Sequence, residues 1–395
     1  MDKKLAFQIL GIPETKEEEQ IRQQYLTLLK ETNPEDDPDG FRRLREAYEE
    51  ALRLSKVQEE GEEEEPQGEL DLWMKRVREN YRDIFLRRDV STWKELFDDP
   101  VCIGFDTFLE ARGRLLGFLT GHSFLPQTVW RLLDQVFHVL DDFEALKEDF
   151  HVNFLRHIEY HVQTADFLDY GLFEESEDGY EPESDEDTDD YIIEFFQIKN
   201  KLEENDTEGV LQALSDLKRH GLYHPYEDVE RLRLFIRTEE CEQVRELAEQ
   251  LIERYADDNY VRIWTGRIFS HTGEEKRAYE LWEAVLAEDS DYYMAKYFAM
   301  HYLVDQKQWY QAEKYLDDLI KVNRRDEELL EVRETIGQEL VPMLQAAVAE
   351  EKDFEDLSGK ELKFYLGWCL FDLERYEDTL AFLEEHGESL DGDEK

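Results

Sequence analysis

The chain has few of the residues that break helices, form disulfides or carry positive charge. Its 395 residues include 19 glycines, 9 prolines and 3 cysteines, and 47 lysines and arginines stand against 99 aspartates and glutamates. Scarce glycine and proline favour helices over turn-rich structure. The net charge of −52 excludes unassisted nucleic-acid binding, because phosphates would be repelled, and disfavours anionic membrane surfaces for the same reason. Basic protein partners, or simple solubility, remain as interpretations.

The cysteines and the apolar runs indicate the compartment. Cys102, Cys241 and Cys369 lie far apart without metal-ligand spacing, and an odd number leaves one without a disulfide partner. No apolar run approaches the about 18 residues of a transmembrane helix. The first residues lack the apolar core and cleavage site of a signal peptide. We therefore expect a cytoplasmic protein without a membrane-spanning part.

Apolar and aromatic residues, in contrast, are frequent and recur at helical spacing. They make up 41% and 13% of the chain, which is too much for a disordered protein. Strand-like alternation is rare, so the predicted fold class is all-α. Two acidic blocks interrupt the helical pattern and divide the chain into residues 1–56, 69–172 and 191–390.

The blocks at residues 57–68 and 173–190 are predicted to be acidic linkers. The first contains Glu62, Glu63, Glu64 and Glu65 in a row, and the second holds eleven acids and no base between Glu174 and Asp190. Like charges repel one another and bury nothing, so such runs are usually solvated. The alternative is that these acidic segments bind a basic partner.

Residues 1–56 predict helices around a polar loop. Apolar residues share one face over residues 16–31 and again over residues 41–52, and Thr15 with Glu18 fits a capping box. The segments FQILGIP, EEEQIRQQYLTLL and FRRLREAYEEAL, in this order, resemble the J-domain family. The alternative is a generic antiparallel helical pair.

The loop of this J-like domain departs from the family motif. Asn33, Pro34 and Glu35 stand where J-domains carry His-Pro-Asp, the motif that contacts a heat-shock ATPase. Asn33 cannot ionise, Glu35 moves the charge outward by one methylene, and the second helix is too acidic for strong electrostatic docking. The resemblance implies a docking module with these three residues as candidate partner contacts. Stimulation of a heat-shock ATPase through the Asn-Pro-Glu loop is the alternative.

Residues 69–172 predict a helical middle domain. Its W-x-x-L and L-P-x-x-V-W-x-x-L segments loosely resemble bacterial J-domain co-chaperone-like proteins. His157 and His161 are four residues apart and would share a helix face, as paired zinc ligands do. The zincin H-E-x-x-H pattern is absent. A metal-dependent activity at this pair is therefore a second alternative, beside histidines that bind no metal.

Residues 191–390 carry a period of about 34 residues. Ala278 recurs as Ala312 downstream and as Val244 and Val210 upstream, whereas the window near Ala346 is irregular. The pattern resembles tetratricopeptide repeats, which implies paired helices stacked into a solenoid.

Aromatic residues in the repeats are further candidates for partner binding. They would line a groove or pack between neighbouring repeats, and they are Tyr292, Tyr293, Tyr297, Trp309 and Tyr310. No phosphate-binding glycine loop, Gly-x-Ser-x-Gly motif or cysteine–histidine pair occurs. We therefore expect no enzyme and no cofactor, and we predict a scaffold that binds proteins or peptides.

Overall fold

The described part of the chain is almost entirely helical. The computed structural model describes Gln24 and residues 68–176, 179–182 and 184–386. Strands β1 (Glu174–Glu175) and β2 (Leu222–Tyr223) form one short antiparallel pair, and the predicted all-α class is confirmed. The J-like domain with Asn33, Pro34 and Glu35, and nearly all of the first acidic linker, lie outside the described residues.

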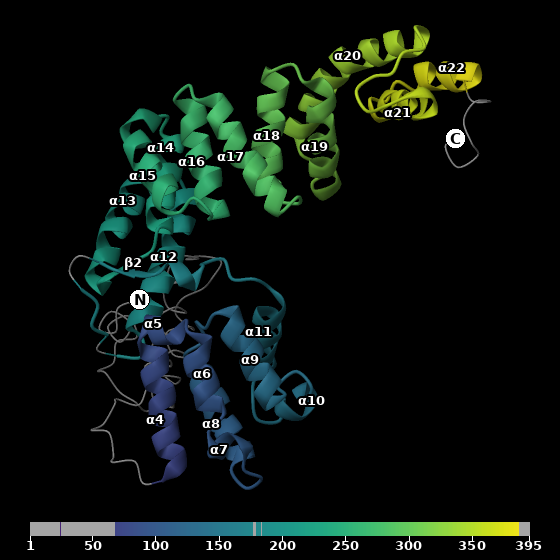
Figure 1. Ribbon diagram of the computed structural model, residues 1–395. Helices are drawn as coiled ribbons and strands as arrows, with labels where there is room; N and C mark the ends of the chain where they lie inside the picture. Colours follow the sequence, from purple (N-terminus) through teal and green to yellow (C-terminus); the bar gives the residue numbers. More distant parts are fainter. Residues whose placement is uncertain (1–23, 25–67, 177–178, 183, 387–395) are drawn as a thin grey trace.

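The middle domain is a bundle of the helices α4 to α11 (Figure 1). Their bounds are α4 (Glu69–Arg82), α5 (Ile84–Arg87), α6 (Val90–Phe97), α7 (Pro100–Ile103), α8 (Phe108–Leu119), α9 (Gln127–Phe137), α10 (Phe143–Leu146) and α11 (Val152–Gln163). The carboxylates of Asp83, Asp89 and Asp99 accept backbone N–H groups at the starts of α5, α6 and α7. This capping explains why three short helices follow one another closely.

From α12 onward most helices come in pairs that lead away from the middle domain (Figure 1). The pairs are α12 (Asp187–Glu203) with α13 (Thr207–Asp216), α14 (Tyr226–Arg237) with α15 (Arg245–Arg254), α16 (Asn259–His271) with α17 (Glu275–Glu288), α18 (Tyr293–Asp305) with α19 (Trp309–Val322), and α21 (Gly359–Asp372) with α22 (Tyr376–His386). Single helices are α20 (Glu327–Ala349) and the 3-10 turns η1 (Tyr170–Leu172), η2 (Leu217–His220) and η3 (Cys241–Val244). Among the described helices, none is long and apolar enough to cross a bilayer.

A left-handed residue marks the turn inside each of the first four pairs. These residues are Asn205 (φ 60°), Glu239 (59°), Gly273 (86°) and Lys307 (60°). Each follows the previous one by the ~34 residues of one repeat. The next position in this series is Val341, whose branched side chain disfavours a positive φ. No turn forms there, so α20 continues to Ala349, which explains the irregular window near Ala346.

Close packing of small residues holds a pair together. A Cβ atom added to Gly266 on α16 would lie 2.7 Å from Nε1 of Trp282 on α17, so glycine permits the two helices to approach. Trp282 and Ala278 are buried, and the Trp282 indole N–H donates to the Ile263 carbonyl at 3.2 Å. The predicted paired helices of the repeat segment are confirmed in the described part, from α12 to His386 at the end of α22.

The second acidic segment, residues 173–190, is built into the fold. Asp185 and Asp189 are only 3% and 5% exposed, and α12 begins between them. The prediction of a solvated linker is therefore wrong for this part of the segment. Its physical reason is neutralisation, because Arg78 and Arg82 of α4 contact the Asp185 carboxylate at 3.1 and 3.0 Å.

A buried ion pair joins the middle domain to the repeat array. Arg87 is fully buried, and its Nη1 donates to Asp189 Oδ1 at 2.6 Å. The Tyr81 hydroxyl donates to Asp189 Oδ2 at 2.8 Å, and the guanidinium lies 3.7 Å from the centre of the Tyr81 ring. Burial raises the pKa of the Asp189 carboxyl, although Arg87 opposes this shift. A specific polar contact thus fixes α5 against α12.

Candidate partner-binding face of the repeat array

Cationic side chains recur at one position of successive repeats. Lys199, Arg233, Arg267 and His301 lie on α12, α14, α16 and α18, each ~34 residues after the previous one. All four are partly buried. We call these four residues the cation row. Since equivalent positions of stacked repeats face the same side, the row lies along the first helices of the pairs.

Contacts between neighbouring first helices confirm this alignment. The Arg233 guanidinium lies 4.7 Å from the centre of the Trp264 ring on α16, and the Arg267 guanidinium lies 5.0 Å from the centre of the Phe298 ring on α18. Each arginine therefore lies over an aromatic ring of the next first helix, at a similar distance in both cases. Such cation–π contacts are favourable for a guanidinium.

The two central arginines differ in their partners. Arg233 Nη1 donates to Glu230 Oε2 at 2.6 Å and to the Tyr260 hydroxyl at 3.0 Å, and Glu230 is buried. Within the described part of the chain, Arg267 makes no ion pair, and its contact is the ring of Phe298. Burial lowers the pKa of Arg267, while Tyr297, Cys241 and the Glu328 carboxylate act in the opposite direction. Arg267 is thus a partly desolvated cation whose nearby carboxylate lies beyond ion-pair distance.

The ends of the row are weaker cations. The Lys199 ammonium lies 3.4 Å from the centre of the Phe167 ring, and burial lowers the pKa of Lys199. His301 Nε2 lies 3.5 Å from Glu328 Oε1, and burial lowers the pKa of His301 as well. At neutral pH the charge of the row therefore resides mainly on Lys199 and the two arginines.

Two of the predicted aromatic residues lie beside the row. Tyr293 and Tyr297 stack on α18 with ring centres 6.5 Å apart, and the Tyr297 hydroxyl donates to Glu328 at 2.6 Å. The Tyr297 ring also lies 4.6 Å from the His301 ring. The structure therefore brings Tyr293 and Tyr297 together with the last member of the cation row.

The other three predicted aromatic residues serve packing. Tyr310 is 4% exposed, and its hydroxyl donates to Asp356 after α20, which agrees with the packing alternative for this residue. Tyr292 and Trp309 are partly buried against the apolar cores of the array. The physical reason is the stacking of repeats, which covers aromatic residues at the starts of the helices.

The cation row is missed when only apolar residues are compared at the repeat spacing. The same shift of about 34 residues applied to charged residues would have connected Lys199, Arg233 and Arg267. Most charges of a soluble helical array have no reason to recur, so periodic cations are an informative signal.

The paired histidines of the middle domain are packed side chains. The rings of His157 and His161 lie 4.3 Å apart, and the ring of Trp130 lies 5.8 and 6.3 Å from them. Burial lowers the pKa of His157. Across the described ranges, no group of three or more potential ligands could hold a metal ion. The pair therefore lacks a third ligand there.

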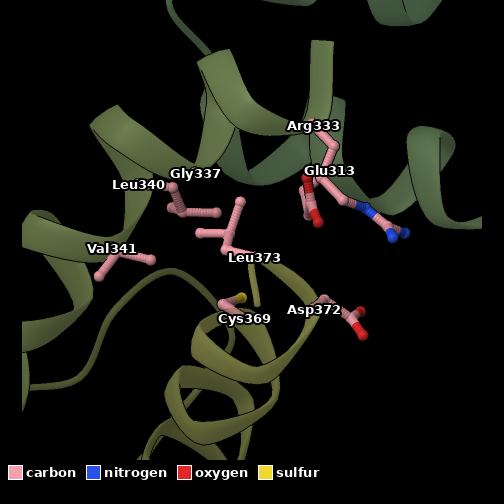
Figure 2. A pocket seen from close by; sticks show the side chains of 8 residues that line it. All are labelled: Glu313, Arg333, Gly337, Leu340, Val341, Cys369, Asp372 and Leu373. Carbon is pink, nitrogen blue, oxygen red and sulfur yellow. The ribbon is translucent and has the colours of Figure 1, made fainter. Parts of the chain in front are cut away.

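A small pocket lies where α19, α20 and α21 meet. Figure 2 shows Glu313 and Arg333 above, with Cys369 and Asp372 from α21 below them. Glu313 is buried, and its Oε2 has no hydrogen-bond partner among the residues that the structure describes. Burial and then the nearby Asp317 raise the pKa of Glu313 to about 8, while Arg333 acts in the opposite direction.

Glu313 should make the protein less stable as the pH rises. Its ordinary pKa is 4.5, so the unfolded chain loses this proton near pH 4.5, whereas the folded protein keeps it up to a pH of about 8. The stability that the bound proton provides is complete below pH 4.5 and is lost as the pH approaches 8. Urea unfolding across this range should show a smaller loss of unfolding free energy in Glu313→Gln. Equal pH dependence in both proteins would contradict this assignment.

The fold defines the class of protein first: apart from one short strand pair, the described residues form a helical middle bundle and a stacked array of helical pairs. Residues 71–165 match the family model described as the DjlB/C second domain. The match covers most of the middle domain and less than half of the chain, and it agrees with the resemblance of this region to J-domain co-chaperone-like proteins.

Other comparisons add little. No curated protein matches the chain. A tetratricopeptide repeat protein from Parabacteroides merdae, known from a crystal structure, is similar over 51% of this chain and 80% of its own, with 12% identity and a TM-score of 0.30. A TM-score this low has no weight, so the assignment of helical pairs rests on the turns and packing described above.

Proposed function

We propose that this protein is a non-enzymatic, co-chaperone-like scaffold that binds proteins or peptides on its repeat array. The observation that supports the proposal most is the cation row with its flanking aromatic residues on one face of successive first helices. Extended surfaces of this kind, built from stacked repeats, are suited to peptide or protein partners. The match of residues 71–165 to the DjlB/C second domain supports the co-chaperone-like context.

A second candidate is an active J-domain co-chaperone. The DjlB/C match is compatible with both candidates, and in this one Asn33, Pro34 and Glu35 would form an atypical contact with a heat-shock ATPase. In the preferred function the same residues belong to a docking module whose His-Pro-Asp motif is degenerate. The two candidates differ in whether this protein accelerates ATP hydrolysis by a bound ATPase, and the following experiment also measures that rate.

Site-specific photocrosslinking in living bacteria tests the proposed binding face. A photoreactive amino acid replaces Tyr293, beside the cation row, or Lys276, whose side chain is 84% exposed on α17. Discrete protein adducts are expected from position 293 and not from position 276. Adducts at neither position, or equal adducts at both, would contradict the proposal. If the adduct is formed with a heat-shock ATPase, the single-turnover ATP hydrolysis of that ATPase is measured next. If the wild-type chain accelerates this hydrolysis and the Pro34→Ala variant does not, the second candidate is correct.

A further inference from the structure

Apolar side chains are exposed together on α21 and α22, at the end of the repeat array farthest from the middle domain (Figure 1). Phe364, Trp368 and Phe371 share one side of α21, and Tyr376 and Leu380 share one side of α22. Their exposed fractions range from 41% to 63%. The Phe371 ring joins the two helices, since its centre lies 5.9 Å from that of Trp368 and 5.8 Å from that of Tyr376. We call these five residues the terminal apolar face.

In the preceding pair of helices, the next helices cover the equivalent surface. Glu374 (φ 57°) marks the turn between α21 and α22 as Lys307 (φ 60°) marks the turn between α18 and α19, about two repeat lengths earlier. In this alignment Leu380 corresponds to Glu313, which is 7% exposed because α20 and α21 lie over it. The terminal apolar face is therefore the surface on which a further pair of helices would stack.

The size of this face is in the range of a protein–protein contact. Terminal repeats of a solenoid need a polar outer side to stay soluble. Here four aromatic side chains, each about half exposed, leave about 300–500 Å² of apolar surface in water. This is a large part of the about 800 Å² that each partner buries in a stable complex. Residues 387–395 contain one large apolar side chain, Leu390, and so match this surface poorly.

The apolar residues of α21 are arranged to pair with a second copy of themselves. A two-fold axis beside Trp368 places α21 antiparallel to α21 of another copy. The two Trp368 side chains then pack on each other. Phe364, four residues before Trp368, meets Phe371, three residues after it, in the other copy. The contact is thus the same on both sides of the axis.

The charges around α21 favour the same arrangement. Lys360 and Lys363 lie in its first turns, whereas Glu374 and Glu377 lie just beyond its end. Antiparallel pairing brings the lysines of one copy to the glutamates of the other, and a parallel pairing would bring like charges together.

We propose that two copies of this protein associate through the terminal apolar face as a two-fold dimer, with their α21 helices antiparallel across Trp368. This inference goes beyond the proposed function and does not depend on the cation row. The dimer carries two copies of the proposed binding face, so that a partner with two binding segments is held by both.

Sedimentation-velocity ultracentrifugation of the full-length protein over a wide range of concentrations tests the proposal. The wild type should change from monomer to dimer as its concentration rises. Trp368→Glu places two carboxylates beside the two-fold axis and should raise the dimer dissociation constant at least about 30-fold, as expected for a central aromatic contact. Phe105→Glu changes an exposed aromatic residue of the middle domain and should leave this constant unchanged.

Two further measurements exclude misfolding and test the orientation. At concentrations where the wild type is monomeric, Trp368→Glu should unfold like the wild type, because Trp368 is half exposed. Lys360→Glu and Glu377→Lys should each weaken the dimer, and the double variant should regain affinity, since opposite charges face each other again. Failure of this recovery would contradict the antiparallel arrangement.

Three results would overturn the dimer itself. A wild type that stays monomeric would leave the terminal apolar face to a different protein. A Trp368→Glu variant that dimerises like the wild type would place the interface elsewhere. Equal weakening by Phe105→Glu would show a general effect of apolar surface. None of these results affects the proposed function, because crosslinking from position 293 does not involve α21.

Discussion

Replacing Asp189 with alanine should lower the free energy of unfolding by about 3–5 kcal/mol. Asp189 is the carboxylate that compensates Arg87, which is fully buried at the contact between α5 and α12. Without it, Arg87 keeps its charge in a site that water does not reach. Urea unfolding, followed by circular dichroism, measures the effect.

The same physics makes two control variants informative. Arg87→Met combined with Asp189→Leu removes both charges and fills the space, so its stability should be close to that of the wild type. Asp71→Ala removes the carboxylate of the exposed Asp71–Arg114 pair, for which a loss of at most about 1 kcal/mol is expected. A small effect of Asp189→Ala, similar to that of Asp71→Ala, would show that the contact between middle domain and array opens to water.

Replacing Trp282 with alanine should destabilise the repeat array by about 3–5 kcal/mol. Trp282 is 2% exposed, fits against Gly266, and lies 5.3 Å from the Phe298 ring between centres. Its removal leaves a cavity between α16, α17 and α18, where neighbouring repeats stabilise each other.

Trp368 on α21 is the matched control for Trp282. It is 50% exposed, so Trp368→Ala removes the same side chain without creating a buried cavity and should change the unfolding free energy little. Thermal unfolding of both variants beside the wild type measures the difference. Equal destabilisation by the two substitutions would contradict the packing role assigned to Trp282.

Much of the array could be predicted because its information is local and repeated. Gly266, Ala278 and Trp282 form one packing unit. The period repeats its buried positions with other residues, as in Val210, Val244 and Ala312. The positive-φ turn explains where the period fails, since Val341 stands at the expected turn and α20 continues. The candidate site was harder to predict, because only two of the five named aromatic residues, Tyr293 and Tyr297, lie with the cation row.

The sequence by itself determined the all-α class, the middle domain and the period of the array, because helical apolar spacing and repeat length are properties of neighbouring residues. Only the tertiary structure decided where the charges lie. Asp185 and Asp189 are buried because Arg78, Arg82 and Arg87 meet them from a distant part of the chain. Whether a carboxylate is solvated or buried depends on such partners, and no local pattern in an acidic sequence reveals them.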